Sequence, residues 1–477
     1  ALACLGAEPF LGPDRKHRIL PWTGALVLLA AIAAVLLAPL AGGTLHLDGL
    51  YALDPARRWL VAAVLAAGAV GLGGIQQSLS RDRFPGGEPY ALALFAVAGA
   101  VLMVQACDAL ALFVGLEITS LAVYALVGLR RHRPESNEAL FKYFVMGAVF
   151  SAVFLYGAAL AYGATGSTRF GQVALDGRGQ LWLLGHALMV IALLFKVGAV
   201  PFHSWAPDAY TGAPVAVTGL MGAIVKVGGF TALGALWLNM ATALSGQSAT
   251  ALPLTATPAL TEAARGILLP FSLVFVLLAV LSIAVGNLSA LKQTSVRRIV
   301  AFSSIAHAGF MLFVFVLPAA GLDVGLQALW LYLIAYALAT AATLTAVAGL
   351  AGGDDAHDDL ASLAGQARLQ PLHGITLTIS LAATAGIPPT LGFLGKFAVL
   401  AGLVSTGSAW WPWAVAAMVL AVVGAIYYLR LIVALWVAEP KRPALAGDGL
   451  LATWGIVLAA AALIALVAIP NLIAPAA

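Results

Sequence analysis

Apolar runs of about 20 residues follow one another along nearly the whole chain, separated by short polar segments. A run of that length lets an α-helix cross the hydrocarbon core of a bilayer, whereas a membrane β-barrel would show shorter segments of alternating polarity. The pattern predicts thirteen membrane-spanning helices, at residues 19–41, 57–79, 89–107, 109–129, 137–163, 181–203, 214–240, 266–288, 297–318, 324–350, 372–403, 410–437 and 450–472.

The first apolar segment, residues 1–12, is too short to cross a membrane. We expect it to be the end of a helix whose start is missing from this sequence, which brings the predicted number of spans to fourteen. The spans are numbered below with this segment as span 1, so that residues 19–41 form span 2 and residues 450–472 form span 14. The alternative is a remnant of a signal peptide, but a basic cluster follows the segment in place of a cleavage site.

Composition points to the same class of protein. Hydrophobic residues make up 62% of the chain and charged residues only 9%, whereas soluble domains carry roughly a quarter charged residues. Because the loops are short, we expect an all-α membrane protein with a single polytopic domain over residues 1–477.

The charges in the loops predict an orientation. The loops after spans 1, 3, 5, 9, 11 and 13 hold fifteen Lys and Arg residues, and the opposite loops hold five. Since Lys and Arg accumulate on the cytoplasmic side, this bias places the first set in the cytoplasm and both termini outside. The chain has 24 Lys and Arg residues, and the remaining four are Lys142, Lys196, Lys226 and Lys396.

These four lysines and Glu117 lie inside predicted spans. A cation at the centre of a bilayer costs about 2.5–3.5 kcal/mol on insertion scales, so such residues usually face a protein interior or a wet cavity and often mark an ion path. A carboxylate paired with a lysine that opens and closes would switch the lysine between holding and releasing a proton. The alternative is a static buried ion pair that fixes helix packing.

Two of the predicted spans are interrupted. Span 7 runs into Pro201 and the polar stretch 203–214, and span 12 carries Gly386 and the pair Pro388–Pro389 in its middle. Broken helices at membrane depth are tolerated where they line a cavity or are buried in protein. Because the two breaks lie five spans apart, they predict two inverted five-helix repeats, spans 4–8 and 9–13. The corresponding segments are 1–88 for the N-terminal helices, 89–240 and 266–437 for the repeats, and 450–477 for the last helix.

Other polar residues within spans have simpler alternatives. Glu138 precedes Lys142 by four residues, so a helical surface ion pair explains both. His307, in the middle of span 10, is either a proton relay or a hydrogen-bonded core histidine. We expect Asp208 to cap the short segment that follows the break in span 7.

Several motifs that would indicate cofactors or nucleic acid are missing. The two cysteines, Cys4 and Cys107, are far apart and form no CxxC motif, which argues against iron–sulfur and covalent haem sites. The sequence has no Walker A and no GxGxxG motif, and its basic residues form no arm for nucleic acid. We therefore expect no cofactor, metal or nucleic-acid site in this chain.

Two further clusters have mainly structural interpretations. The acidic run after span 11 is expected to be a solvated loop, with a metal site through His357 as the alternative; its members are Asp354, Asp355, Asp358 and Asp359. The glycines Gly71, Gly73 and Gly74 lie inside an apolar run and are expected to allow close helix packing.

Five stretches of the sequence, in order and spacing, resemble one protein family. They are FVGLEITSLAVYALVGL (Phe113–Leu129), NEALFKYFVMGAVFSAVFLYG (Asn137–Gly157), PFHSWAPDAYTGAP (Pro201–Pro214), RRIVAFSSIAHAGF (Arg297–Phe310) and GIPPTLGFLGKF (Gly386–Phe397). They resemble the N-subunit family of proton-pumping NADH:quinone oxidoreductase, respiratory complex I, whose members are antiporter-like membrane subunits. The resemblance covers nearly the whole chain.

This resemblance implies a fourteen-helix proton channel unit in the membrane arm of the complex. It implies that Glu117 pairs with Lys196, that Lys226 is the central connecting lysine, and that protons leave near Lys396. Lys142 and His307 match polar positions along the same axis. It further implies FMN, iron–sulfur clusters and quinone in partner subunits only. The implied surroundings are other membrane-arm subunits, lipid, protons and internal water, in a bacterial inner membrane.

Two other functions remain open at this point. A subunit of a multisubunit Na⁺/H⁺ antiporter would share the same Glu and Lys positions, but differs from this chain in the segment Asp208–Pro214. A membrane scaffold that transports nothing would show no continuous polar path between Glu117, Lys196, Lys226 and Lys396.

Overall fold

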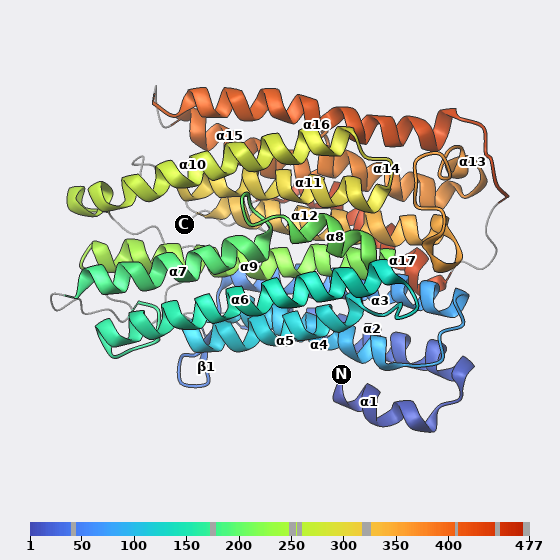
Figure 1. The fold of residues 1–477 in the computed structure, drawn as a ribbon, viewed down its shortest axis with the longest axis horizontal. Coiled ribbons are helices and arrows are strands. Elements are labelled where there is room, and N and C mark those ends of the chain that lie inside the picture. The colour runs from blue at the N-terminus through green and yellow to red at the C-terminus, as the bar shows by residue number, and fades with distance from the viewer. Residues whose placement is uncertain are drawn as a thin grey trace.

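The computed structural model of the chain describes residues 1–39, 44–171, 178–247, 254, 260–316, 326–405, 409–443 and 449–470. Within these residues, long helices lie roughly parallel in one bundle whose long axis follows the helices (Figure 1). Twelve of the described helices are long and apolar enough to cross a membrane. The all-α membrane fold predicted from hydropathy is therefore confirmed.

The helices match the predicted spans closely. Their bounds are α1 (Leu2–Ala7), α2 (Pro13–Leu37), α3 (Pro55–Arg81), α4 (Glu88–Gln105), α5 (Ala109–Val127), α6 (Pro134–Thr165), α7 (Gly179–Val197), α8 (Trp205–Gly212), α9 (Val215–Leu244), α10 (Glu262–Leu291), α11 (Val296–Leu312), α12 (Gln327–Ala351), α13 (Gln366–Leu369), α14 (Pro371–Ala385), α15 (Leu391–Ser405), α16 (Trp411–Val437) and α17 (Leu450–Ala465). Short 3₁₀ turns are η1 (Glu8–Phe10), η2 (Phe313–Val316), η3 (Gly353–Asp355) and η4 (Leu466–Ala468). A small hairpin, which the hydropathy pattern does not reveal, pairs β1 (Thr44–His46) with β2 (Tyr51–Leu53).

The difference between twelve helices and fourteen predicted spans has two sources. The first segment forms only the short helix α1, and span 12 is divided into the two half-helices α14 and α15. Neither half-helix alone has the length of a full span.

Side chains at the helix starts explain several of the boundaries. The carboxylate of Asp54 accepts from the backbone N–H of Arg57 at 2.9 Å, and that of Asp108 accepts from Leu110 and Ala111 at 2.8 and 3.0 Å. Such caps satisfy backbone donors that the first helical turn leaves unpaired. The helices α3 and α5 therefore begin directly after these two aspartates.

The two predicted breaks occur where the sequence places glycine and proline. Helix α7 ends at Gly198, whose φ is +71°, and α14 ends at Gly386, whose φ is +82°. Glycine takes this left-handed conformation without steric cost, and the prolines that follow have no N–H to continue a helix. The chain then resumes as α8 and α15. The breaks lie five spans apart, as two inverted repeats require.

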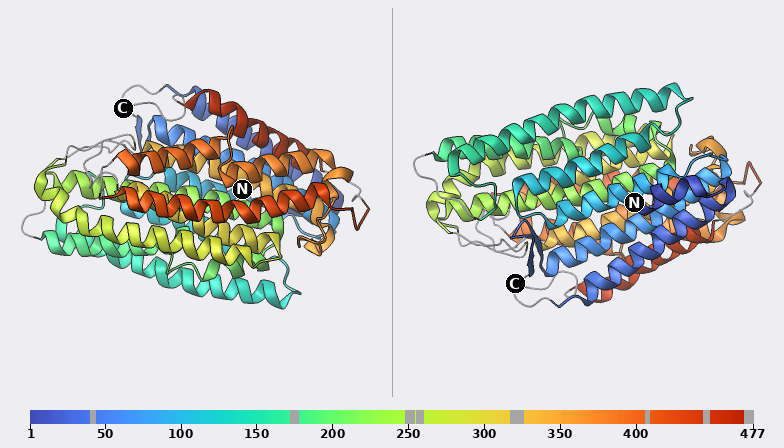
Figure 2. Two further views of the ribbon diagram at one scale, coloured as in Figure 1. Left: turned by 90° about the horizontal axis from the view of Figure 1, so that it is seen from above. Right: turned by 90° about the horizontal axis from the view of Figure 1, so that it is seen from below.

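Helices α9 and α12 form the centre of the bundle. The most apolar windows of both are completely buried inside the protein, whereas the corresponding windows of α6 and α16 are only 28% buried. Figures 1 and 2 show α6 and α16 on opposite outer sides, with α9 and α12 between them. Helix α17 packs against α3 and α12, beside the N-terminal helices (Figure 2).

The glycines of α3 permit these close contacts, as predicted. A Cβ atom on Gly71 would meet Leu220 of α9 at 2.9 Å, and one on Gly74 would meet Thr345 of α12 at 2.9 Å. A Cβ on Gly73 would meet the backbone of Ala452 in α17 at 2.8 Å. Helices α9, α12 and α17 thus each approach α3 closely at a glycine, which has no side chain.

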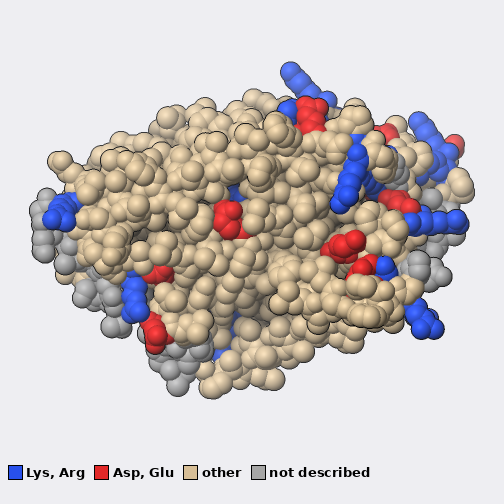
Figure 3. Space-filling view, turned by 60° about the horizontal axis from the view of Figure 1, so that its bottom comes forward, with Lys and Arg blue, Asp and Glu red and all other residues tan. Residues whose placement is uncertain are grey.

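The described charges gather at the two ends of the bundle. Figure 3 shows Lys, Arg, Asp and Glu side chains mainly at the ends of one face, with a broad, almost uncharged band between them. Residues of the basic loop set contact one another: Arg430 donates to the carbonyls of Leu291 and Gln293, and Arg442 donates to that of Ser362. We call this the basic end of the bundle.

The acidic run at the basic end is not the solvated loop that we expected. Asp355 is only 3% exposed and Asp358 only 9% exposed. Asp355 forms an ion pair with Arg130, and Asp358 forms one with Arg297. The prediction was wrong because the basic partners come from segments distant in sequence, the turn after α5 and the start of α11, which the tertiary fold brings to this position.

Candidate functional site: a row of buried lysines and hydroxyls

Lys196 lies at the last turn of α7, directly before the helix break, and is 3% exposed. Its Nζ is 3.4 Å from the hydroxyl of Tyr124 and lies over the rings of Tyr124 and Tyr143, at 5.3 and 5.5 Å from their centroids. Aromatic faces attract a cation, so these rings favour the ammonium form of the lysine. No carboxylate among the described residues is in direct contact with Lys196.

Glu117 is partly exposed on α5 and accepts a hydrogen bond from the hydroxyl of Ser151 on α6. Tyr124 lies seven residues further along α5, which is about two turns, so both side chains share one face of that helix. Among the described residues, Lys196 thus contacts Tyr124 and Glu117 contacts Ser151, and the ion pair expected between Glu117 and Lys196 is not formed.

Lys226 lies in the middle of α9 and is 4% exposed. It donates to the hydroxyl of Ser304 at 2.7 Å and to the backbone carbonyl of the same residue, both on α11. The ring centroid of Tyr336 lies 5.1 Å from its Nζ, and Tyr210 reaches the Ser304 hydroxyl at 3.4 Å. Among the described residues, the partners of this buried ammonium are neutral oxygens and an aromatic face.

A small cavity joins the first two lysines. Its volume is about 10 Å³, enough for about one water molecule. Its lining includes Tyr143, Lys196, Tyr210, Lys226 and Ser304. Because these side chains supply several hydrogen-bonding groups, a water there would connect Lys196 to Lys226.

His307 lies one turn further along α11 than Ser303 and Ser304, on the same face. Its Nδ1 is 2.8 Å from the hydroxyl of Tyr332, and its Nε2 is 3.1 Å from the hydroxyl of Tyr428. Tyr428 also bonds the hydroxyl of Ser303. A neutral imidazole has one donor and one acceptor nitrogen, so the two tyrosines satisfy both at once.

Lys396 lies on α15, immediately after the second break, and is partly buried. Its Nζ donates to the carbonyls of Thr384 and Ala385 at 2.6 and 3.0 Å. These carbonyls belong to the last turn of α14, where a helix leaves its C=O groups unpaired and carries partial negative charge. A second cavity of about 10 Å³ connects this lysine with His307, Tyr428 and Asn287.

Lys142 lies outside this row. Its side chain is 46% exposed, and its Nζ is 2.6 Å from Glu138 and 2.9 Å from Asp208. The helical pair with Glu138 is thus present. Asp208 lies in the first turn of α8 and meets Lys142, in place of the capping bond that we expected, while Ser204 takes the N-cap position.

Sequence reasoning missed the hydroxyl groups that connect the row. They belong to Tyr124, Tyr210, Tyr332 and Tyr428, all of which are at most 5% exposed. For Tyr124, Tyr332 and Tyr428, the available signal was a tyrosine within an apolar span, where its hydroxyl must find a buried partner. That partner lies on another helix in each case, so the sequence alone does not identify it.

The arrangement suits the transfer of protons. Hydroxyls donate and accept at the same time, a neutral imidazole does so through its two nitrogens, and an ammonium that loses a proton can regain it from a neighbour. The order of groups is Glu117, Lys196, Lys226, His307 and Lys396, with hydroxyls and two small cavities between them. No group of three His, Cys, Asp or Glu side chains in the described ranges is arranged to hold a metal ion.

The fold and this row of charges define a class of protein, the antiporter-like membrane subunits. The chain belongs to the family described as NADH:quinone oxidoreductase/Mrp antiporter, transmembrane, whose model matches residues 106–257 and 267–424. Within it, the chain is 37% identical to subunit N of the NADH-quinone oxidoreductase of Neisseria gonorrhoeae, over 91% of this chain and 89% of that protein. It is 35% identical to a second N subunit, from Rhizobium meliloti, over 90% of this chain and 84% of that protein. The resemblance seen in the sequence is thereby confirmed.

Solved structures agree with this assignment. A chain of respiratory complex I from Thermus thermophilus shares 33% identity, covers 99% of this chain with 96% of its own length, and superposes with a TM-score of 0.78. A chain of the Mrp complex from Dietzia sp. DQ12-45-1b superposes with a TM-score of 0.81, and the match covers 100% of this chain and 94% of that chain. At 19% identity, this match shows only the shared fold. The chain is therefore a membrane-arm subunit of the complex I type.

Proposed function

We propose that this subunit carries protons across the membrane along the buried row from Glu117 to Lys396. The observation that supports this most is the surroundings of Lys226. A lysine at the centre of a fully buried helix has as partners a hydroxyl, a carbonyl and an aromatic ring, and no carboxylate among the described residues. A purely structural ammonium would normally be paired, because an unpaired buried charge is costly.

The path begins at the basic end, which we place in the cytoplasm of a bacterium because Lys and Arg accumulate there. Protons load Lys196, pass through the first cavity to Lys226, and continue over Ser304 and the tyrosine-bound His307 to Lys396. They leave at the opposite end of the bundle. The Glu117 carboxylate acts on Lys196 through space, without a direct ion pair.

Transfer against the membrane potential requires energy from elsewhere. Moving one charge against 100 mV costs about 2.3 kcal/mol. We propose that redox chemistry in partner subunits supplies this energy, and that FMN, iron–sulfur clusters and quinone are bound there. The neighbours of this chain would then be other membrane-arm subunits and lipid of the bacterial inner membrane.

Replacing Lys226 with alanine tests the proposal. In the assembled complex in membrane vesicles, Lys226→Ala should lower the number of protons pumped per NADH oxidised. Lys292→Ala removes an exposed lysine from a loop and should leave this ratio unchanged. If both variants pump like the parent complex, the row of lysines carries no protons, and the scaffold function becomes the better explanation.

The family description also names the Mrp antiporter, so exchange of Na⁺ for H⁺ is the alternative to proton pumping. The same vesicles distinguish the two. Proton pumping along the row should continue at full rate in Na⁺-free medium, whereas an exchanger would stop without Na⁺.

A further inference from the structure

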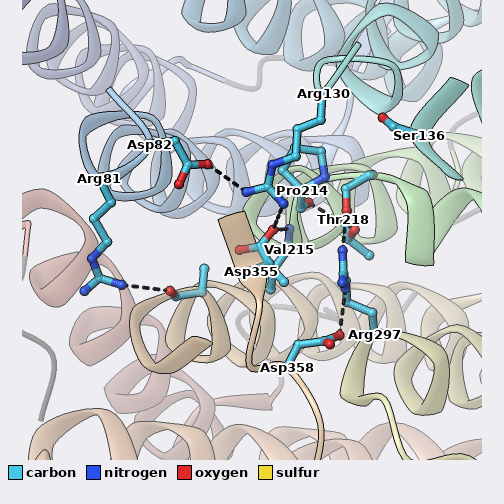
Figure 4. Close-up of polar contacts among 12 residues, drawn as sticks. Arg81, Asp82, Arg130, Ser136, Pro214, Val215, Thr218, Arg297, Asp355 and Asp358 are labelled. Carbon is cyan, nitrogen blue, oxygen red and sulfur yellow. Dashed lines mark hydrogen bonds and ion pairs between the residues drawn. The ribbon is translucent and has the colours of Figure 1, made fainter. Parts of the chain in front are cut away.

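The loop between α12 and α13, residues 352–365, contacts the junction between α8 and α9 at the basic end (Figure 4). This junction, Ala213 and Pro214, leads directly into Val215, the first residue of the helix that carries Lys226. Nothing in the proton row itself requires such a contact. The acidic side chains of the loop therefore call for their own explanation.

Asp355 holds the start of α9 on one side. One of its oxygens, Oδ2, accepts from the backbone N–H of Val215 at 2.8 Å and from Nη1 of Arg130 at 2.7 Å. The other guanidinium nitrogen of Arg130, Nη2, donates to Asp82 at 2.8 Å. Arg130 follows α5 and Asp82 follows α3, so one buried carboxylate ties three segments to the N-terminus of α9.

Asp358 holds the same junction on the other side, through Arg297. The Nε of Arg297 donates to Asp358 at 2.7 Å, and its Nη1 donates to the carbonyl of Ala213 at 2.9 Å. The last carbonyl before Pro214 and the first N–H after it are thus both bound by side chains. We call this set of contacts, made by Arg130, Arg297, Asp355 and Asp358, the clamp.

A large cavity lies next to the clamp. Its volume is about 740 Å³, and its lining includes Asp82, Arg130, Pro214 and Gly353 as well as the exposed Arg131 and His132. The clamp residue Arg130 and the junction residue Pro214 thus form part of its wall. Thr218, one turn into α9, is fully buried beyond that wall, where its hydroxyl donates to the carbonyl of Tyr210 at 2.9 Å.

The buried carboxylate of Asp355 is not fully satisfied. Its second oxygen, Oδ1, is buried and has no hydrogen-bond partner among the described residues. A buried carboxylate normally uses both oxygens, so an unpaired one is a place where water would be bound if it arrived. This oxygen is therefore a free hydrogen-bond acceptor for water that enters when the wall of the cavity opens.

We propose that the clamp is the gate between this cavity and the proton row, and that the structure shows it closed. Release of Asp355 from Arg130 and from the N–H of Val215 frees the N-terminus of α9 and lets water pass from the cavity along the α8–α9 junction. The role of that water as a proton source rests on the proposed function, but the opening itself does not. Arg130 and Asp355 are positioning residues, which act on Lys226 through the helix that carries it.

The opening can be measured with a thiol reagent. Thr218→Cys, in a chain with Cys4→Ser and Cys107→Ser, places a nearly isosteric thiol just behind the clamp. In inside-out vesicles, a membrane-impermeant maleimide should react slowly with this cysteine in the otherwise unchanged protein. Asp355→Ala removes two hydrogen bonds of a charged group and should raise the labelling rate by about tenfold or more.

A matched control lies on the same loop. Asp359→Asn removes the same charge four residues later, where among the described residues the side chain accepts hydrogen bonds from Ala361 and Ser362 in its own turn. It should leave both labelling and pumping unchanged. Arg130→Gln removes the ion-pair partner that holds Asp355 in place and should reproduce the effect of Asp355→Ala, so the test survives if one variant fails to assemble.

The outcomes separate the gate from the proton row. Unchanged labelling in both Asp355→Ala and Arg130→Gln would overturn the gate, whatever Lys226→Ala does to pumping. Where Lys226→Ala does lower the ratio of protons pumped to NADH oxidised, raised labelling without a lower ratio would also overturn the gate, because an open gate onto a working row must loosen coupling. Raised labelling together with a lower ratio supports the gate, and intact pumping in Lys226→Ala would refute the proton row alone.

Discussion

The hydroxyl of Tyr428 provides a sharp test of how the two halves of the row are connected. It bonds Nε2 of His307 at 3.1 Å and also the hydroxyl of Ser303, which neighbours the serine that holds Lys226. Tyr428→Phe removes one oxygen atom and keeps the ring. The change should therefore interrupt the connection between Lys226 and Lys396 without creating a large cavity.

The expected magnitude follows from the two partners left behind. A buried polar atom without a partner costs about 1–3 kcal/mol, and Tyr428→Phe leaves one on His307 and one on Ser303. The small adjoining cavity admits about one water, which can restore part of this loss. We expect about 2 kcal/mol to remain, which lowers the population of the connected arrangement about 30-fold.

The assay compares proton pumping with NADH oxidation in vesicles that contain the assembled complex. Tyr90→Phe is the matched control, because the Tyr90 hydroxyl bonds Nδ1 of His17 at 2.7 Å and lies outside the row. Tyr428→Phe should lower the protons pumped per NADH, and Tyr90→Phe should not. Equal ratios in the two variants would refute the assignment of Tyr428 to the path.

Two further predictions follow from the lysines and the second break. Lys142→Ala should change the pumping ratio and the stability of the complex little, because the pairs of this lysine with Glu138 and Asp208 are half-exposed; a large loss of pumping would show that Lys142 belongs to the path. Gly386→Ala should destabilise the protein by about 1–2 kcal/mol, since a side chain at φ +82° is strained and its Cβ would lie 2.9 Å from Lys396. A thermal melt of the purified complex measures the second effect, and an unchanged melting temperature would contradict it.

Hydropathy was sufficient to locate the helices because each span must satisfy its backbone hydrogen bonds internally. Local sequence therefore carries the information, and the predicted breaks at Pro201 and Pro388–Pro389 fell where the structure has them. The same local rule does not reveal the β1–β2 hairpin, whose short strands lie in a loop. It also gave a wrong expectation for Asp355 and Asp358, whose partners lie on segments distant in sequence.

The same distinction between local sequence and tertiary contacts applies to the candidate site. The sequence by itself determined that Lys196, Lys226 and Lys396 lie within the bundle, because no loop accounts for them and their spans are apolar. Only the tertiary structure decided what each ammonium contacts: a tyrosine on α5, a serine on α11, or the carbonyl end of α14. The physical reason is that burial follows from the composition of one helix, whereas a hydrogen bond is a property of two helices and of the angle at which they pack.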